Sequence, residues 1–179
     1  LFFFTHTPAS QILSGLVGSE MCIRDRDDGT VISESISICR YLEEIYPNPA
    51  LFGTTAETRA IIDMWLRRFE LDGFLPMLHA VRNHLENFKG RVIPGTRTDL
   101  PQVPEMVTRG IEMGKMFLER VEPHMAENEF VAGSRFSVAD ITAFFTIKLT
   151  TPLKIEINES YPGVAAWMDR MSKREAFNI

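Results

Sequence analysis

Glu34 and Ser35 combine residue types and a position that favour binding chemistry. They stand just before apolar residues at helical spacing, so Ser35 is expected to begin a helix. The first amides of a helix, the positive end of its dipole and a serine hydroxyl together attract a carboxylate. The alternative interpretation is an ordinary helix cap, which local chemistry alone favours. Both interpretations predict a helix start at this point.

A second pair with defined spacing is Ser137 and Asp140. Serine is a favoured N-cap residue, and a carboxylate three residues later can accept the backbone N–H of the cap. Phe136 and Ile141 occupy the two positions of a hydrophobic staple. The apolar stretch that follows has no polar face, so it should be a buried central helix. We interpret Ser137 and Asp140 as a structural cap and not as a catalytic pair.

Other patterns exclude several kinds of site. No glycine-rich phosphate loop and no nucleophile elbow occur in the sequence. Cys22 and Cys39 are too few and too unpatterned for a disulfide scaffold or a zinc site, which favours a reducing cytoplasm. No metal site is expected, because the histidines are scattered without a second ligand at metal spacing. They are His6, His79, His84 and His124.

Composition limits the partners. The chain has 179 residues, of which 45% are apolar, so it can bury a sizeable core. Its net charge of −5, without any run of Lys or Arg, argues against nucleic acid or an anionic membrane surface as a partner. No segment reaches the length of a membrane span. No signal peptide is expected, because the chain lacks the basic region that begins one. The absence of an initial Met indicates an incomplete chain.

The first part of the chain mixes strands with one helix. Leu1–Phe4 is expected to be a short buried strand. Asp27–Gly29 is typical of a hairpin turn, and Thr30–Ile32 after it of a β-branched strand. A helix is then expected from Ser35 to Ile45. The segment Ser14–Arg26 fits no element.

The second part is expected to be all helical. Prolines and a glycine in residues 47–54 mark a linker between a domain of residues 1–46 and a domain of residues 55–179. Helices are expected to start near Thr55, at Pro104, after Ser137 and at Pro162.

Two features of these helices predict their geometry. The apolar stripe slips between Phe69 and Phe74, close to Pro76, which predicts a bend. Gly110 and Gly114 predict a close helix approach. The helix that carries them has a second apolar stripe and should be largely buried.

Three ordered motifs resemble the cytosolic glutathione transferases. Residues 28–35 (DGTVISES) look like the end of the thioredoxin-like domain of that family. Residues 133–141, with RFSVADI at 135–141, resemble the buried capping segment of its C-terminal domain. The helix from Tyr161-Pro162 to Trp167 is similar to a later helix of the family. The resemblance covers residues 27–177.

The resemblance implies a mostly α fold, in which a glutathione transferase C-terminal helical bundle follows a thioredoxin-like α/β domain. It implies that Glu34 and Ser35 bind the γ-glutamyl end of glutathione. Residues 4–11 are similar to the loop that holds the hydroxyl or thiol activating glutathione. Ser10 matches best, with Thr7 and Thr5 as alternatives, and a simple loop serine remains the other interpretation. Such a hydroxyl would donate a hydrogen bond to the sulfur and favour the thiolate.

The N-terminal part departs from the family pattern. Only 15 residues lie between Gln11 and Asp27, whereas a strand, helix and strand unit needs about 30. The Val-Pro pair that the family places before the Asp-Gly hairpin is absent. Residues 14–26 look foreign to the family, and Cys22 is given no catalytic role. A truncated thioredoxin-like domain is therefore expected.

These resemblances predict a detoxifying transferase that conjugates the glutathione thiolate to a small apolar electrophile. Glutathione is then a co-substrate, and no permanently bound cofactor is expected. The family also implies a homodimer. The activity of this chain should be impaired by its N-terminal part. The alternative is a non-catalytic glutathione transferase-like module for binding or assembly.

Overall fold

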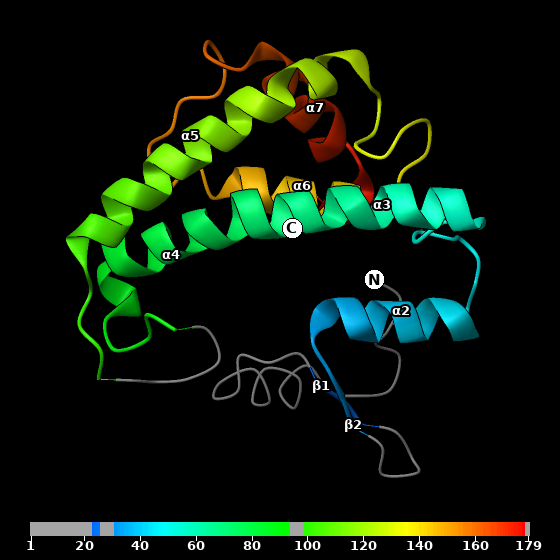
Figure 1. Ribbon diagram of the computed structural model, residues 1–179, viewed down its shortest axis with the longest axis horizontal. Coiled ribbons are helices and arrows are strands. Elements are labelled where there is room, and N and C mark those ends of the chain that lie inside the picture. Colours follow the sequence, from blue (N-terminus) through cyan, green and yellow to red (C-terminus); the bar gives the residue numbers. More distant parts are fainter. Residues whose placement is uncertain (1–22, 26–30, 94–98, 178–179) are drawn as a thin grey trace.

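The computed structural model describes residues 23–25 (backbone only), 31–93 and 99–177. In Figure 1 a long helical run crosses the molecule, with the later helices of the chain above it and a small α/β part below it. The elements are β1 Ile23–Asp25, β2 Val31–Ser33, α2 Ser35–Ile45, α3 Ala56–Arg68, η1 Phe69–Phe74, α4 Leu75–His84, η2 Glu86–Phe88, α5 Pro104–Glu127, α6 Val138–Lys148, α7 Pro162–Ser172 and η3 Glu175–Phe177. The fold is mostly α, as the sequence predicts.

The small part contains an antiparallel pair of strands, β1 and β2, in which Ile23 lies opposite Ser33. This pairing confirms the predicted hairpin, although its turn at Asp27–Gly29 lies outside the described residues. The segment Ser14–Arg26 was not assigned to any element from the sequence, and Ile23–Asp25 within it form β1. Three residues are too few to display an alternating pattern.

The long run consists of α3, η1 and α4. Its predicted start is confirmed: the hydroxyl of Thr55 accepts the Thr58 N–H at 3.1 Å, and the Thr58 hydroxyl accepts the Thr55 N–H at 3.0 Å. Where the apolar stripe slips, the chain forms a π-helical turn. A π-helical turn shifts the following side chains around the axis, which explains the slip. Pro76 lies in the first turn of α4, where a missing N–H is tolerated.

The close approach predicted at Gly110 and Gly114 is confirmed, and it joins α5 to α4. A Cβ on Gly110 would lie 2.5 Å from the carbonyl oxygen of Pro76. A Cβ on Gly114 would lie 2.8 Å from the side chain of Met77. Any larger residue would push the two helices apart, so these glycines set the distance between them.

The core surrounds α6, which packs on α3, η1 and α7. Ala139, Ala143 and Ile147 of α6 have no exposed surface, and neither have Phe69 of η1 and Trp167 of α7. These side chains close the bundle around one apolar centre. Burial of this kind supplies most of the free energy that stabilises such a helical domain.

Two helices are less buried than the sequence predicts. Phe145 of the central α6 is 41% exposed. On the second stripe of α5, Met106 and Met113 are exposed as well, together with the neighbouring Met116. Apolar spacing alone gives the number of apolar faces on a helix but not how many of them find a partner within one chain.

Candidate functional site

The start of α2 has an unusual backbone. Glu34 precedes the helix with φ of 71°, in the left-handed region that residues other than glycine seldom adopt. No side chain caps the helix start, so the ordinary cap that local chemistry favoured is not formed. The Ile38 N–H does bond to the Glu34 carbonyl at 3.0 Å. A non-glycine residue in this conformation costs about 1–3 kcal/mol and is found preferentially at binding sites.

Glu34 and Ser35 are exposed and line a cleft of about 310 Å³. One wall comes from the first turns of α2 and the other from α3 and η1. The second wall includes Asp63, Arg67 and Glu70. The cleft therefore presents carboxylates, guanidinium groups and a helix N-terminus together. That combination suits a ligand which carries both a carboxylate and an ammonium group.

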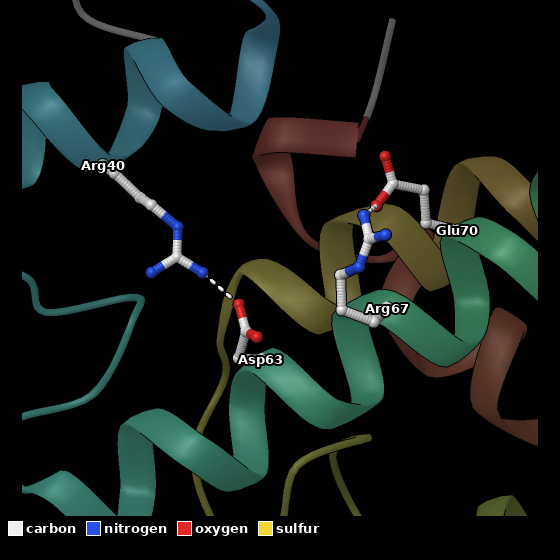
Figure 2. A network of polar contacts seen from close by, with 4 residues as sticks. All are labelled: Arg40, Asp63, Arg67 and Glu70. Atoms are coloured by element: carbon white, nitrogen blue, oxygen red, sulfur yellow. Dashed lines mark hydrogen bonds and ion pairs between the residues drawn. The ribbon is translucent and has the colours of Figure 1, made fainter.

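Figure 2 shows two ion pairs at this cleft. Arg40 extends from α2 to Asp63 on α3, and thereby connects the two walls. Arg67 pairs with Glu70 at 2.6 Å within the second wall. All four side chains are between 39% and 52% exposed, so each pair contributes only about 0–1 kcal/mol. They help to position the two walls and orient their charges, and they add little to the global stability of the fold.

Partly buried hydrogen bonds of Glu43 also hold α2 in place. Both carboxylate oxygens of Glu43 accept backbone N–H groups of the linker, from Leu51 at 2.6 Å and from Phe52 at 3.0 Å. The Leu51 carbonyl in turn accepts the N–H of Val138, the first residue of α6, at 3.1 Å. Arg40 lies 4.8 Å from the ring centre of Phe52. The linker thus connects α2 to the central helix.

Sequence analysis missed Arg40, Glu43, Asp63 and Arg67 as parts of this region. The i,i+3 spacing of Arg67 and Glu70 was a usable signal. Arg40 and Asp63 are 23 residues apart, and no local pattern relates them.

Asp140 makes the contacts of a helix cap at the start of α6. Its side chain is fully buried. One carboxylate oxygen accepts the Val131 N–H at 2.8 Å, and the other accepts the N–H of Ser137 at 2.8 Å and its hydroxyl at 3.0 Å. Burial raises the pKa of Asp140, and the N–H groups of Val131 and Ser137 offset part of this shift. The bond to Val131, which ties the preceding loop to α6, was not foreseen.

The predicted thiol-activating residues Ser10, Thr7 and Thr5 lie outside the described residues, as does Cys22. Within residues 31–93 and 99–177 no group of three or more His, Cys, Asp or Glu side chains is placed to hold a metal ion. In the same part of the chain no helix is both long and apolar enough to cross a membrane.

Residues 108–175 match the family "Glutathione S-transferase, C-terminal domain". A Gtt2-class glutathione S-transferase of Vibrio parahaemolyticus is similar in structure, with a TM-score of 0.72 and 33% identity over 87% of this chain and 68% of that one. The chain belongs to the glutathione S-transferase family. The Gtt2 structure from Saccharomyces cerevisiae is also similar, with a TM-score of 0.76 and 26% identity over 87% of this chain and 72% of that one.

Curated sequences agree with this family assignment. Glutathione S-transferase 2 of Saccharomyces cerevisiae is 27% identical over 152 residues, which are 85% of this chain. Glutathione S-transferase F10 of Arabidopsis thaliana is 29% identical over 150 residues, or 82% of this chain. The chain spans 63% of the length of the yeast relative and 66% of the Arabidopsis one.

Proposed function

We propose that this family member derives from an enzyme that conjugates the glutathione thiolate to small apolar electrophiles in the cytoplasm. The observation that carries the proposal is the start of α2, where Glu34 and Ser35 line the 310 Å³ cleft beside an uncapped helix N-terminus. The γ-glutamyl end of glutathione carries one carboxylate and one ammonium group. It matches the mixed charges of this cleft.

The carboxylate and the ammonium of the γ-glutamyl end each have a binding partner in this proposal. The carboxylate lies at the first amides of α2 and the hydroxyl of Ser35. The ammonium lies among the carboxylates of Glu34, Asp63 and Glu70, which line the same cleft. The electrophile then occupies apolar surface of the helical domain, and we do not assign its identity.

In this account the chain conjugates glutathione only feebly. The hydroxyl of Ser10, or of Thr7 or Thr5 in its place, must come within about 3 Å of the sulfur to favour the thiolate. The strands of a complete thioredoxin-like domain hold that hydroxyl in register with Glu34 and Ser35. Because only 15 residues separate Gln11 from Asp27, we expect this chain to lack the strands that keep that register.

The test compares this chain with a version that has a complete thioredoxin-like domain, in retention on glutathione-agarose and in conjugation of a standard electrophile. We expect weak retention and little conjugation by the chain. The completed protein should be retained on the column and should conjugate the electrophile. Ser10→Ala in the completed protein should lower kcat far more than it raises KM. Equal conjugation by both proteins would contradict the account of the N-terminal part. Retention without conjugation by the completed protein would favour the non-catalytic module.

We also propose that the completed protein is a homodimer formed through α3 and α5. Both helices expose apolar side chains that the core of one chain does not cover, among them Ile61 and Met64 on α3 and Met113 and Met116 on α5. Sedimentation velocity should give a dimer at micromolar concentration. Met116→Glu, which places a charge on the most exposed of these residues, should shift the population to monomer. If the completed protein without this substitution sediments as a monomer at that concentration, this part of the proposal is refuted.

A further inference from the structure

The linker between α2 and α3 makes hydrogen bonds in two directions. Toward α2, the N–H groups of Leu51 and Phe52 donate to the carboxylate of Glu43 at 2.6 and 3.0 Å. Toward α6, the Leu51 carbonyl accepts the N–H of Val138 at 3.1 Å. Leu51 therefore uses its N–H for one helix and its carbonyl for the other. These bonds join α2, the linker and α6 in one continuous set of contacts.

The α6 end of these contacts is fixed by burial. Val138 is the first residue of α6 and is only 4% exposed. The N–H of a first helical residue has no acceptor within its own helix, so it is available to the linker. Phe52 belongs to the apolar core, and the partly buried Leu51 packs against that core. The two linker residues thus extend the rigid helical part toward α2.

The α2 end has little support of its own. No residue of α2 is fully buried, and Ile36 is only partly buried against the core. Glu43 and Ser35 belong to the same helix of 11 residues, which moves as a unit. The hydrogen bonds of Glu43 therefore also restrain the first turn of α2, where Glu34 and Ser35 line the cleft proposed to bind glutathione.

We propose that the start of α6 positions this cleft through the linker, with Glu43 as the positioning residue on α2. The inference rests on the proposed function, because it concerns binding at the same cleft. With the bonds intact, the first turn of α2 stays opposite Asp63 and Arg67. When they are lost, α2 also adopts displaced positions, and the apparent Kd of glutathione rises as the competent fraction falls. None of Glu43, Leu51 and Val138 lines the cleft, so their effect on glutathione is indirect.

The first test removes the acceptor on α2. Glu43→Ala deletes both oxygens that accept the linker N–H groups, and Glu44→Ala removes an equal charge from the exposed neighbouring position. The Kd of glutathione is obtained from the protection of residues 35–37 against hydrogen exchange over a range of glutathione concentrations. We expect Glu43→Ala to raise this Kd about fivefold or more, and Glu44→Ala to leave it within about twofold. Glu43→Gln, which keeps one acceptor oxygen, should lie between the two.

The second test removes the donor on α6. Val138→Pro deletes the N–H that bonds to Leu51, and proline is well tolerated at the first position of a helix. Ser137 before it is extended, with φ of −141° and ψ of 176°, which suits a residue that precedes proline. Val138→Ala is the matched control, because it keeps the N–H and loses side-chain volume at the same position. We expect the proline variant to raise the Kd of glutathione about threefold or more, and the alanine variant to leave it within about twofold although it lowers Tm.

These variants distinguish positioning from a general loss of stability. Circular dichroism shows whether each variant is folded, and exchange in α2 without glutathione should be faster in Glu43→Ala and Val138→Pro. If Val138→Pro does not fold, the comparison of Glu43→Ala with Glu44→Ala decides. An unchanged Kd in folded Glu43→Ala, or an equal rise in Val138→Pro and Val138→Ala, would overturn the inference. Absence of protection by glutathione in the wild type would instead refute the proposed binding of glutathione, and the inference would fall with it.

Discussion

The helical part from α3 to α7 and the α/β part before it are held together in different ways. The helical part encloses an apolar core in which Leu66, Phe69 and Trp167 are at most 1% exposed. In contrast, α2 has no fully buried residue. Two apolar residues beside it, Val31 and Tyr46, are 62% and 64% exposed. The first part is stabilised by burial, whereas the described residues of α2 are held against it by polar contacts and by the partly buried Ile36.

This difference bears on the candidate site, which lies at the boundary of the two parts. Asp63 and Arg67 belong to a wall that the core supports. Glu34 and Ser35 belong to a wall that depends on Arg40 and Glu43 for its position. Substitutions that weaken the contacts of α2 should therefore lower ligand affinity while barely altering the global free energy of unfolding.

The largest expected effect contrasts a core residue with an exposed one. Phe69→Ala removes a fully buried ring that packs edge-on against Phe117, with centroids 5.0 Å apart. It should lower the free energy of unfolding by about 3–5 kcal/mol in urea titrations. Tyr46→Ala, in the exposed region after α2, should lower it by less than about 1 kcal/mol. Similar losses for the two variants would contradict the distinction between the parts.

The second largest effect is expected at the cap of the central helix, α6. Asp140→Ala leaves the N–H groups of Val131 and Ser137 without their buried acceptor and should cost about 2–4 kcal/mol. Thermal unfolding measures this as a substantial fall in Tm. Asp169→Ala, which removes a carboxylate from an exposed pair with Lys173, is the control and should change Tm little. An unchanged Tm in Asp140→Ala would show that the cap is dispensable.

A smaller and local effect is expected from Glu43→Gln. The amide replaces one of the oxygens that accept the Leu51 and Phe52 N–H groups, at a cost of about 1 kcal/mol. Hydrogen exchange should become faster in α2 and in the linker and remain unchanged in α6. Glu44→Gln, at the exposed neighbouring position, should leave exchange in α2 as it is. Faster exchange throughout the helical part would mean that the two parts unfold together.

The smallest expected effect is the pH dependence from Asp140. Burial raises the pKa of Asp140 in the folded protein above its ordinary value, so the folded state holds this proton more tightly than the unfolded chain. Its contribution to stability is then largest below about pH 4 and declines as the pH rises through the folded-state pKa. In urea titrations, the free energy of unfolding of the wild type should therefore fall relative to that of Asp140→Asn as the pH rises through this range. A wild type that gains on the variant as pH rises through this window would contradict the direction of the pKa shift.

The helices of this fold were predictable because their signals are local. The Thr55 start, the apolar run after Ser137 and the glycines facing α4 all follow from side-chain chemistry and spacing. The stripe slip near Phe69 located an irregularity, although its form as a π-helical turn required the packed structure. The three-residue strand β1 carried too little pattern to be recognised.

Only one wall of the candidate site was predictable from the sequence. Glu34 and Ser35 follow from the helix start and from family resemblance, because both are contiguous signals. The opposite wall, with Asp63 and Arg67, is brought to them by tertiary packing. The contact of Glu43 with the linker likewise depends on how the chain turns after α2, and spacing does not reveal that path.

The central claim is that the start of α2 binds the γ-glutamyl end of glutathione in this chain, however weak its conjugation. Hydrogen exchange with and without millimolar glutathione tests it directly, because the first amides of α2 donate to the ligand in this account. We predict slower exchange in residues 35–37 and unchanged exchange in α7, with the protection lost in Glu34→Gln/Ser35→Ala. Unchanged exchange in residues 35–37 at saturating glutathione, or protection that survives in that variant, would contradict the claim.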